Sequence, residues 1–304
     1  MERPMKALQY AEYGDPEVLR VVDVAEPHAG PGQIRVAVKA VGINPVDWKL
    51  RKGLFKAGLP AITGSDVSGI VDEVGEGVDG VSVGDEVFGS AVSGGAAQFA
   101  LVKNFARKPA DMPFEEAAGL PVPVETAVRA FEVLGLSPGQ TLLVNAAAGG
   151  VGSAAVQLAR ARGADVIGTA SPGNHDYLRS LGATPTTYGD GLPARVKELA
   201  PRGVDAALDA AGRGALPDLV EVTGDAGKVV TIADPQAETY GVKYTSGRGG
   251  ESRAWHALAE AAELWEQGKF SMPVARTFSL AEGPEAHRIS EEGHVRGKLV
   301  LVVD

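Results

Sequence analysis

The chain of 304 residues contains no cysteine. This absence excludes disulfide bonds, thiolate nucleophiles and every zinc or iron–sulfur site that depends on cysteine ligands. It leaves the redox compartment open, because a chain without thiols is compatible with oxidising and reducing surroundings alike.

An excess of positive charge is also missing. The chain carries 29 Lys and Arg against 39 Asp and Glu, which gives a formal net charge of −10. Nucleic acids and anionic membranes bind clustered positive charge, so neither is expected as a partner. Hydrophobic residues make up 44 % of the chain and charged residues 22 %, which is typical of a folded globular protein. At this length we expect one large domain or two of ordinary size.

A long uninterrupted apolar run is absent too. The longest apolar stretch, residues 142–159, is broken by Asn145, Ser153, Gln157 and several glycines, so it does not predict a membrane span. The first residues, MERPMKALQYAEYGD, lack the apolar core of a signal peptide. The cytoplasm is therefore the expected location.

Short β-like segments dominate the first third of the chain. Apolar and polar residues alternate with a period of two over residues 34–38. Further short apolar runs lie at residues 19–24, 68–74, 85–89 and 98–102. Regularly spaced short strands with glycine turns predict a small antiparallel barrel or sandwich.

Strand and helix patterns alternate from about residue 113 onward. The expected strands are residues 141–145, 165–169, a short segment near 188, 204–209 and 228–233. The expected helices between them are residues 152–162, 171–182, 192–200 and 215–222. This alternation predicts a parallel sheet covered by helices on both faces. A glycine-rich stretch at 246–250 then precedes an amphipathic helix, and a strand, helix and strand close the chain.

A glycine-rich turn, AAAGGVGSAA, follows directly after the expected strand 141–145. Ala147, Gly149 and Gly152 occupy the positions of the dinucleotide-binding fingerprint, with alanine in place of the first glycine. The middle glycine lets the backbone approach a pyrophosphate, and the third lets the helix pack on the strand. The helix N-terminus supplies N–H groups and a positive dipole end for the anion. A dinucleotide cofactor is therefore predicted, and an ordinary glycine turn is the alternative.

The end of the next expected strand carries no acidic residue. About 20 residues after the glycines, an NAD-binding protein places Asp or Glu against the ribose 2′-hydroxyl. Here Ser171, Asn174, His175 and Arg179 follow the strand, and this neutral-to-basic set suits a 2′-phosphate. We therefore predict NADPH as the cofactor. The alternative is that Ser171 only caps a helix and that the other three side chains are solvated.

The histidines suggest no metal site. His28, His175, His256, His287 and His294 form no His-x-x-x-His pair, and none stands beside a carboxylate at ligand spacing. No catalytic metal is therefore expected. A Gly-x-Ser-x-Gly elbow is also missing from the sequence, which argues against a serine hydrolase.

Several segments together resemble the medium-chain dehydrogenase/reductase superfamily, in its zinc-free quinone oxidoreductase branch. They are YGDPEVLR, VGINPVDWKLRKG, GSDVSGIVDEVGEGV, VGDEVFG, LPVPVETA, NAAAGGVGSAAVQLAR, GVDAALDAAG and GHVRGKLVLV. The resemblance covers nearly the whole chain. It implies an α/β fold in which a Rossmann domain with a doubly wound parallel sheet, residues 118–249, is inserted in a GroES-like β-barrel domain made of residues 1–117 and 250–304.

The resemblance also implies further cofactor contacts. They are Thr126, Ala148, Gly149, Gly150, Val151, Tyr188, Ala210, Ala211 and Ile232. The 148–151 turn is expected to face the pyrophosphate, Thr126 the nicotinamide carboxamide and Tyr188 the adenosine ribose. Ala210, Ala211 and Ile232 are expected at the nicotinamide edge. Each of these residues also has a purely structural interpretation, as a helix, strand or strand-end packing residue.

The residues that bind the catalytic zinc in other members of the superfamily are replaced in this chain. Zinc alcohol dehydrogenases carry a cysteine where this chain has Asn44, and Gly-His-Glu where it has Gly64, Ser65 and Asp66. Their four-cysteine lobe is missing as well. Oxidation through a zinc alkoxide is not expected of such a residue set, because it supplies no Lewis acid to lower the pKa of an alcohol.

A zinc-free member is expected to work by positioning. Hydride passes directly from NADPH to an electron-poor carbon of a quinone or conjugated enone, because the anion produced is stabilised by resonance. Asn44 and Lys49 are the expected hydrogen-bond donors to the acceptor oxygen, with Asp47 as a lesser candidate. The alternative for Lys49 and Asp47 is a surface pair on a short helix.

Two other functions stay open. Enoyl-thioester reductases of the same superfamily resemble this chain, but they typically carry a tyrosine acid near the place of Phe55, and a phenyl ring donates no proton. The second open function is that of a sensor or structural protein that binds NADPH without important catalysis.

A homodimer is expected, because the family commonly pairs through the sheet edge and residues 241–246 suit an edge strand.

Overall fold

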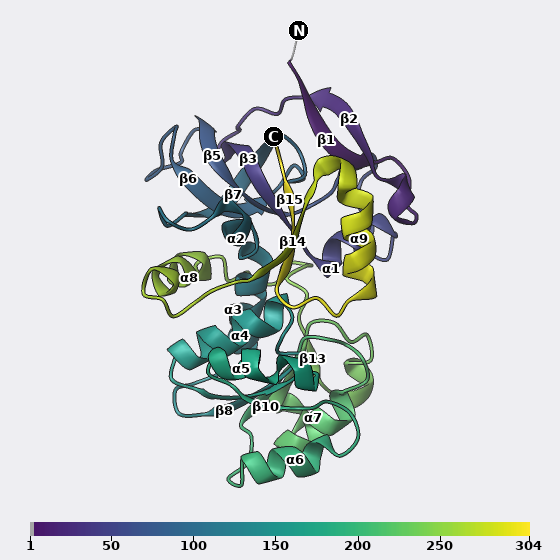
Figure 1. Cartoon of the computed structure of the whole chain (residues 1–304), viewed down its shortest axis with the longest axis vertical. Coiled ribbons are helices and arrows are strands. Elements are labelled where there is room, and N and C mark those ends of the chain that lie inside the picture. The colour runs from purple at the N-terminus through teal and green to yellow at the C-terminus, as the bar shows by residue number, and fades with distance from the viewer. Residues whose placement is uncertain (1–2) are drawn as a thin grey trace. The chain divides into compact units, whose positions relative to one another are not determined.

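The computed structural model describes residues 3–304, which form two compact units (Figure 1). The first unit comprises Met1–Val122 and Leu258–Asp304, and the second comprises Pro123–Ala257. Within the described residues, no helix combines the length and the apolar character that crossing a lipid bilayer requires.

The first unit is built on antiparallel strands. Its six-stranded sheet has the order β14-β15-β3-β5-β6-β7, and an additional β3–β7 pairing closes the last four strands on one another. This pairing covers the edge of β7, which would otherwise expose unpaired backbone groups. The elements up to residue 118 are β1 (Pro4–Tyr10), β2 (Arg20–Ala25), β3 (Ile34–Ile43), α1 (Pro45–Arg51), β4 (Ala61–Ile62), β5 (Asp66–Val74), β6 (Glu86–Ala91), β7 (Phe99–Arg107) and α2 (Phe114–Ala118).

Strand β3 shows why this part of the sequence folds as a barrel. Ile34, Val36 and Val38 are buried, while Arg35 and Ala37 between them are only partly buried, so the expected alternation is confirmed. Two register shifts along the β3–β5 pairing mark irregularities, which bend a strand and increase its twist. This bending allows β3 to pair with both β5 and β7.

The C-terminal segment returns to the first unit, a question that residue spacing alone left open. Helix α8 (Ala257–Glu266) is followed by β14 (Val274–Ser279), α9 (Gly283–Glu292) and β15 (Lys298–Val302). Strand β15 pairs antiparallel with β3, with Leu299 opposite Ile43. The first residue of β15, Lys298, is thereby brought to the end of β3, where α1 begins.

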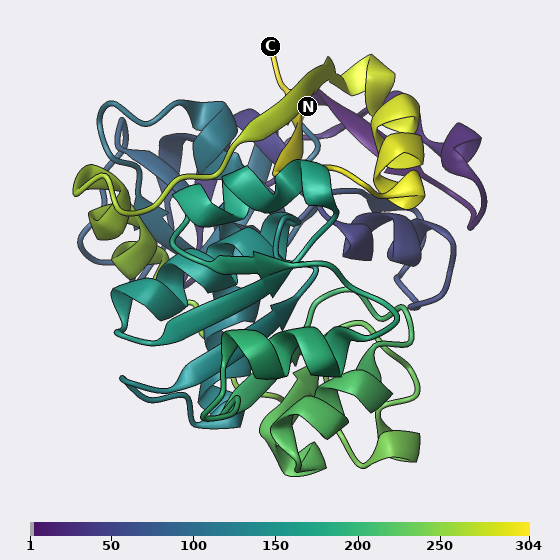
Figure 2. The same ribbon diagram turned by 60° about the horizontal axis from the view of Figure 1, so that its bottom comes forward.

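The second unit contains the expected doubly wound parallel sheet. Its strand order is β10-β9-β8-β11-β12-β13, so the order in which the parallel strands are added reverses between β8 and β11. Helices cover both faces of this sheet (Figure 2). The elements are α3 (Pro121–Leu134), β8 (Thr141–Asn145), α4 (Gly150–Ala161), β9 (Asp165–Thr169), α5 (His175–Ser180), β10 (Thr184–Thr186), α6 (Leu192–Leu199), β11 (Ala206–Asp209), α7 (Leu216–Thr223), β12 (Val229–Thr231) and β13 (Lys243–Tyr244).

Two local expectations in this unit need correction. The expected helix 171–182 is divided into a 3-10 turn at Pro172–Asn174 and the short α5. The expected strand near Tyr188 is β10, which ends at Thr186. It ends there because its parallel partner β9 ends at Thr169, opposite Thr186, so no neighbouring backbone remains to pair with Tyr188.

The boundaries between the units also differ from the expected 117/118 and 249/250. The contacts of the chain divide it after Val122 and after Ala257. The later second boundary has a physical cause, because Arg253 forms an ion pair with Glu125 of α3 and Ala254 donates its backbone N–H to the same side chain. These contacts keep residues 250–257 with the second unit.

Candidate active site

The turn between β8 and α4 has the geometry of an anion-binding loop. Ala146 adopts a left-handed backbone conformation with φ of 63°, which is uncommon for a residue other than glycine. Gly149 is the N-cap of α4 with an extended backbone, and the helix starts at Gly150, two residues earlier than expected. The N–H groups of the first helical turn have no partner within the helix and are therefore available to an anion.

The middle and third fingerprint residues of this turn, Gly149 and Gly152, have different roles. A Cβ atom on Gly152 would lie 2.2 Å from the carbonyl oxygen of Ala146 and 2.7 Å from Cα of Ala147, which only glycine avoids. A Cβ atom on Gly149 would lie 3.6 Å from the same carbonyl oxygen, an ordinary contact. Gly152 thus serves helix packing, whereas Gly149 leaves an open approach to the turn. Both features fit the pyrophosphate of a dinucleotide.

Four polar side chains end four neighbouring strands of the parallel sheet and bond to one another. These residues, the strand-end network, are Asn145, Thr169, Asp209 and Thr231. Thr169 Oγ1 donates to Asn145 Oδ1 at 2.7 Å, and Asn145 Nδ2 donates to Asp209 Oδ1 at 3.0 Å. Thr231 Oγ1 donates to Asp209 Oδ2 at 2.8 Å. All four residues are buried, so the network is shielded from competing water.

The strand-end network holds the loops that carry the expected cofactor contacts. The backbone N–H of Ala146 donates to Thr169 Oγ1 at 3.0 Å, and that of Ala211 donates to Asp209 Oδ1 at 3.1 Å. The N–H of Ala210 donates to the carbonyl of Asn145 at 3.2 Å. Sequence reasoning missed this network. The signal was a polar residue at the carboxyl end of each of four apolar strands.

The residues expected at the 2′-phosphate lie together after β9. Asn174 Nδ2 donates to Ser171 Oγ at 3.2 Å, and His175 Nε2 lies 3.3 Å from the carbonyl oxygen of Ala170. Ser171 is the N-cap residue of the 3-10 turn, as expected, but its side chain makes no capping hydrogen bond there. Arg179 donates to Asp176 Oδ1 at 2.6 Å, which balances its charge. Tyr188 lies beyond β10 and is 57 % exposed.

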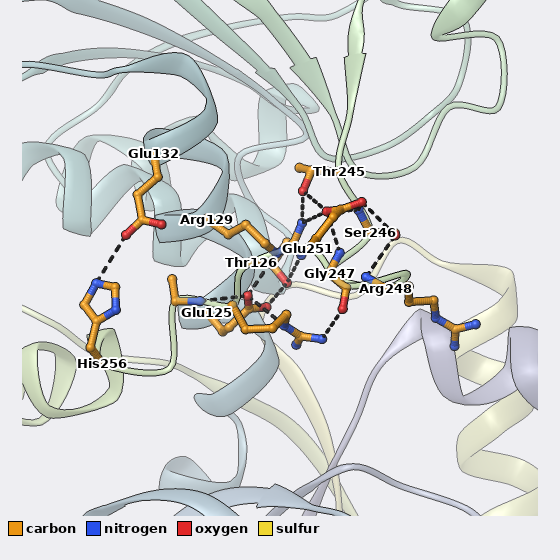
Figure 3. A network of polar contacts seen from close by, with 12 residues as sticks. Glu125, Thr126, Arg129, Glu132, Thr245, Ser246, Gly247, Arg248, Glu251 and His256 are labelled. Carbon is orange, nitrogen blue, oxygen red and sulfur yellow. Dashed lines mark hydrogen bonds and ion pairs between the residues drawn. The ribbon is translucent and has the colours of Figure 1, made fainter.

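Thr126 lies in α3 within a further polar network (Figure 3). Its hydroxyl donates to Glu125 Oε2 at 3.4 Å and accepts from Arg129 Nη2 at 3.4 Å. Thr126 itself is buried. Its hydroxyl is therefore held by two charged neighbours.

The first unit holds a buried group of four polar residues, the first-unit cluster: Asn44, Asp47, Asp66 and Lys298. Asn44 Nδ2 donates to Asp66 Oδ2 at 2.8 Å, and Lys298 Nζ donates to Asn44 Oδ1 at 2.5 Å. The backbone N–H of Asn44 donates to Asp47 Oδ2 at 2.7 Å. Lys298 Nζ also donates to the carbonyl of Ile43 at 2.7 Å. Sequence reasoning included Asn44 and Asp47 but missed Lys298.

Burial changes the acid–base behaviour of this cluster. Burial raises the pKa of Asp47 to about 7, against the lowering effect of its hydrogen bond from Asn44. Burial also lowers the pKa of Lys298, although Asp66 and Asp47 act in the opposite direction. Asp47 is only 3 % exposed, so its interpretation as a surface residue is wrong. The cluster thus holds a carboxyl group that titrates near neutral pH.

Lys49 lies on the same short helix, α1. Burial lowers the pKa of its ammonium group, whose Nζ lies 5.6 Å from the centre of the Trp48 ring. Among residues 3–304, Lys49 Nζ has no carboxylate or hydrogen-bond partner. Two buried atoms of residues next to the cluster in sequence, Trp48 Nε1 and Ser65 Oγ, lack a hydrogen-bond partner in the described chain. Buried polar atoms without a partner are rare in folded proteins, and each of these two could form a hydrogen bond with a polar group of a ligand.

The donor set around Asn44 does not suit a divalent metal. In the part of the chain that the structure describes, no group of three His, Cys, Asp or Glu side chains is arranged to hold a metal ion. At the positions where the zinc-dependent relatives are expected to hold their metal, Asn44 and Asp66 bond to each other. The ammonium group of Lys298 beside them repels a second cation.

Comparisons with known proteins agree with this architecture. Residues 30–110 match the alcohol dehydrogenase GroES-like domain, and residues 181–301 match a family described as zinc-binding dehydrogenase. The 2-methylene-furan-3-one reductase of Solanum lycopersicum is 34 % identical over 98 % of this chain and 79 % of its own length. The quinone oxidoreductase of Rattus norvegicus is 30 % identical over 99 % of both chains.

Solved structures agree as well. The quinone oxidoreductase from Coxiella burnetii superimposes with a TM-score of 0.83, at 30 % identity and coverage of 99 % of this chain and 100 % of its own. The CurK enoyl reductase superimposes with a TM-score of 0.83, at 26 % identity and 99 % coverage of both chains. The expected family and the GroES-like character of the first unit are thereby confirmed. The chain belongs to the medium-chain dehydrogenase/reductase superfamily, whose oxidoreductases use a nicotinamide cofactor.

Proposed function

We propose that this chain is a zinc-independent oxidoreductase that uses NADPH to reduce quinones or α,β-unsaturated carbonyl compounds. The observation that carries the proposal is the Asn44–Asp66 hydrogen bond with Lys298 beside it, a donor set that suits an organic acceptor better than a metal ion. The names of the tomato and rat relatives, a furanone reductase and a quinone oxidoreductase, support the substrate class.

NADPH is preferred over NADH because the loop after β9 carries no carboxylate. Ser171, Asn174 and His175 offer a hydroxyl, an amide and an imidazole. An acidic residue there would bond to a ribose 2′-hydroxyl and repel a 2′-phosphate. The hydrogen bond between Asn174 and Ser171 pre-orients two of the three groups.

The residues of the second unit bind and orient the cofactor. The N-terminal turn of α4 donates backbone N–H groups to the pyrophosphate, with Ala148, Gly149, Gly150 and Val151 in the turn. The strand-end network keeps Ala210, Ala211 and Ile232 in place for the nicotinamide edge. NADPH, when bound, supplies the hydride.

The residues of the first unit bind the acceptor oxygen. A side-chain amide has two N–H donors, and Asn44 uses one of them for Asp66 while its oxygen accepts from Lys298. The remaining N–H is available to the oxygen of a quinone or enone. Lys49 supplies a proton, because its lowered pKa makes the ammonium group a stronger acid than an exposed lysine. Asp47, which titrates near neutral pH, adjusts the charge around Asn44.

The test is a cofactor-oxidation screen with purified protein. Quinones, enones and enoyl thioesters are each supplied with NADPH and, separately, with NADH. We expect turnover of quinones or enones, with NADPH preferred over NADH. Absence of turnover with every acceptor would contradict the proposed activity. Equal use of both cofactors would contradict the assignment of the 2′-phosphate site.

A second candidate is an enoyl-thioester reductase. The similarity to the CurK enoyl reductase favours it, whereas Phe55 near the expected place of a tyrosine acid argues against it. A higher kcat/KM for enoyl thioesters than for the matching free enones in the same screen would favour this candidate. Tight NADPH binding that raises the melting temperature, without reduction of any acceptor, would instead favour a non-catalytic binding protein.

The homodimer remains a prediction with a defined surface. Strand β13 is the last strand of the parallel sheet, as expected for residues 241–246, and Tyr244 is exposed. An edge strand offers unpaired backbone groups to a second copy of the chain. Light scattering that gives the mass of a monomer would rule this association out.

A further inference from the structure

A loop of residues 245–253, here called the 245–253 loop, leaves the second unit at the carboxyl end of β13. Strand β13 runs parallel to β12, and Thr245 donates its backbone N–H to Thr231 at 3.1 Å. The loop therefore begins at the same edge of the sheet as the pyrophosphate turn. In doubly wound sheets this edge is where ligands bind.

A single carboxylate shapes the loop. Glu251 accepts hydrogen bonds from Thr245 Oγ1 at 2.6 Å, from the N–H of Ser246 at 3.1 Å and from the N–H of Gly247 at 3.0 Å. Burial opposes the ionisation of Glu251, but these hydrogen bonds outweigh it and hold its pKa below the usual value. Gly247, Gly249 and Gly250 have positive φ values, so this stretch has little backbone stiffness of its own.

Two residues of α3 connect this loop to the body of the unit (Figure 3). Glu125 is fully buried, and its Oε1 lies 2.9 Å from Arg129 Nε and 2.8 Å from Arg253 Nε. Arg129 donates from Nη1 to Thr245 Oγ1 and lies 3.9 Å from Glu251 Oε2. Two carboxylates and two guanidinium groups thus join the loop to the helix.

The same residues determine the hydrogen bonds of Thr126. A hydroxyl has one proton and two lone pairs. The proton of Thr126 is directed to Glu125 at 3.4 Å, and one lone pair accepts from Arg129 at 3.4 Å. One lone pair remains, so in this arrangement the Thr126 hydroxyl is oriented to accept a hydrogen bond from a ligand.

We propose that Glu125, Arg129 and Glu251 are positioning residues of the nicotinamide site. They fix Thr126 as an acceptor for the amino group of the carboxamide, and they hold the 245–253 loop in one arrangement. This inference rests on the proposed function, in which Thr126 faces the carboxamide. It defines which end of the carboxamide Thr126 binds and therefore which way the nicotinamide ring is turned.

A matched control lies on the same helix. Glu132 of α3 forms an ion pair with His256 at 3.3 Å, and both side chains are largely exposed. Figure 3 shows this pair apart from the contacts around Thr126. Glu132→Gln therefore removes an ion pair between α3 and the segment after the loop without changing the hydrogen bonds of Thr126.

The first experiment follows the loop in the cofactor-free protein. Hydrogen exchange of residues 245–250 is compared in the wild type, Glu251→Gln, Arg129→Met and Glu132→Gln. We expect exchange to be about tenfold faster in the first two variants, because the carboxylate or its cationic partner is lost, and unchanged in Glu132→Gln. Unchanged exchange in Glu251→Gln would overturn the proposed role of this carboxylate.

The second experiment compares NADPH with its 3-acetylpyridine analogue, which carries a methyl group in place of the carboxamide amino group. The wild type should prefer NADPH about three- to tenfold in KM, the effect of one hydrogen bond. Arg129→Met should lose this preference, Arg129→Lys should restore part of it, and Glu132→Gln should keep it. A structural role alone would not change the discrimination between the two cofactors.

The outcomes separate the inference from the proposed function. A wild type that reduces no acceptor with either cofactor contradicts the proposed function, whatever the loop does. A wild type that turns over, with Arg129→Met and Glu251→Gln retaining its KM and its discrimination, overturns the positioning roles alone. If Arg129→Met fails to fold, Glu251→Gln carries the test, because Glu251 is partly exposed.

Discussion

Each unit of the chain contains a buried group of polar residues, and the two groups are assembled differently. The strand-end network takes one residue from the end of each of four strands in one parallel sheet. The first-unit cluster instead brings together α1, β5 and β15, and its Lys298 bonds to an asparagine 254 positions earlier. The strand-end network follows from the repeated βα pattern. The first-unit cluster forms only because the C-terminal strand β15 returns to pair with β3.

The charges of the two groups differ as well. In the strand-end network one carboxylate, Asp209, accepts from two side chains and from backbone N–H groups. In the first-unit cluster two carboxyl groups and an ammonium group share a buried site, and the pKa of Asp47 is raised to about 7. The first arrangement stabilises loops, whereas the second responds to protons.

The largest effect is expected from Lys298→Met, which removes the only cation of the first-unit cluster. Loss of one partner from a buried ionic group lowers the free energy of unfolding by about 3–5 kcal/mol. The kcat of the folded fraction should also fall, because Asn44 loses the bond that orients its amide. Urea unfolding and steady-state kinetics measure the two effects.

Lys108→Met is the matched control. Lys108 is also a buried lysine of the first unit, and its Nζ donates to the carbonyl of Met112 at 2.7 Å and pairs with Glu86 at 2.8 Å. This variant should lose stability but keep the kcat of the folded fraction. Equal kcat values in both variants would contradict a role of Lys298 in orienting Asn44.

The next largest effect is a pH dependence of the free energy of unfolding that comes from Asp47. The pKa of Asp47 rises from 3.8 to about 7 on folding, so the folded state holds the proton more tightly than the unfolded chain. Its stabilising contribution is complete below pH 3.8 and is lost as the pH rises to about 7. The difference in unfolding free energy between the wild type and Asp47→Asn should fall across this window by up to about 1.4 kcal/mol per pH unit.

This comparison cancels the buried titrating groups that Asp47 does not influence. His287, whose pKa burial lowers to about 3, acts in the opposite direction but is present in both proteins. Asp66 and Lys298 are the charged neighbours of Asp47, and both remain in the variant. A pH-independent difference between the two proteins would show that Asp47 does not titrate in this range.

A smaller loss of stability is expected from Gly152→Ala. Its methyl group would contact the turn backbone at 2.2 Å, and such overpacking lowers the free energy of unfolding by about 1–3 kcal/mol. Cofactor affinity should fall with it, because the turn must move. Calorimetric titration with NADPH and thermal unfolding measure both effects.

Gly149→Ala is the counterpart of Gly152→Ala and separates the loss of cofactor affinity from the loss of stability. Its methyl group finds ordinary space within the protein, so stability should be unchanged while cofactor affinity falls, if the pyrophosphate approaches Gly149 closely. Neither glycine variant should alter the pH dependence that belongs to the first-unit cluster. A Gly149→Ala protein with wild-type affinity would contradict this placement of the pyrophosphate.

The smallest effect is expected at the adenosine end of the cofactor. His175→Gln should lower the preference for NADPH over NADH about three- to tenfold, the net contribution of one ordinary hydrogen bond, because the glutamine amide can still donate in part. Arg179→Gln should change it little, because Arg179 is exposed and bonded to Asp176. The ratio of kcat/KM for the two cofactors provides the measurement. A larger effect of Arg179→Gln than of His175→Gln would reverse the assignment.

The sequence by itself determined the features that depend on near neighbours. The period-two pattern of β3 and the strands 141–145 and 165–169 follow from short-range propensity and apolar periodicity. The requirement for glycine at position 152 is equally local, because the clash involves a carbonyl only six residues earlier. Interactions of this range can be deduced from adjacent residues alone.

The tertiary structure decided which polar groups share an environment. The sequence placed Asp47 on a short helix, but only the packing of the unit buries it and raises its pKa. It did not indicate that Lys298 reaches Asn44, or that Glu125 and Arg253 keep residues 250–257 with the second unit. Burial and electrostatic interaction depend on distance in space, and that distance is set only after the chain has folded.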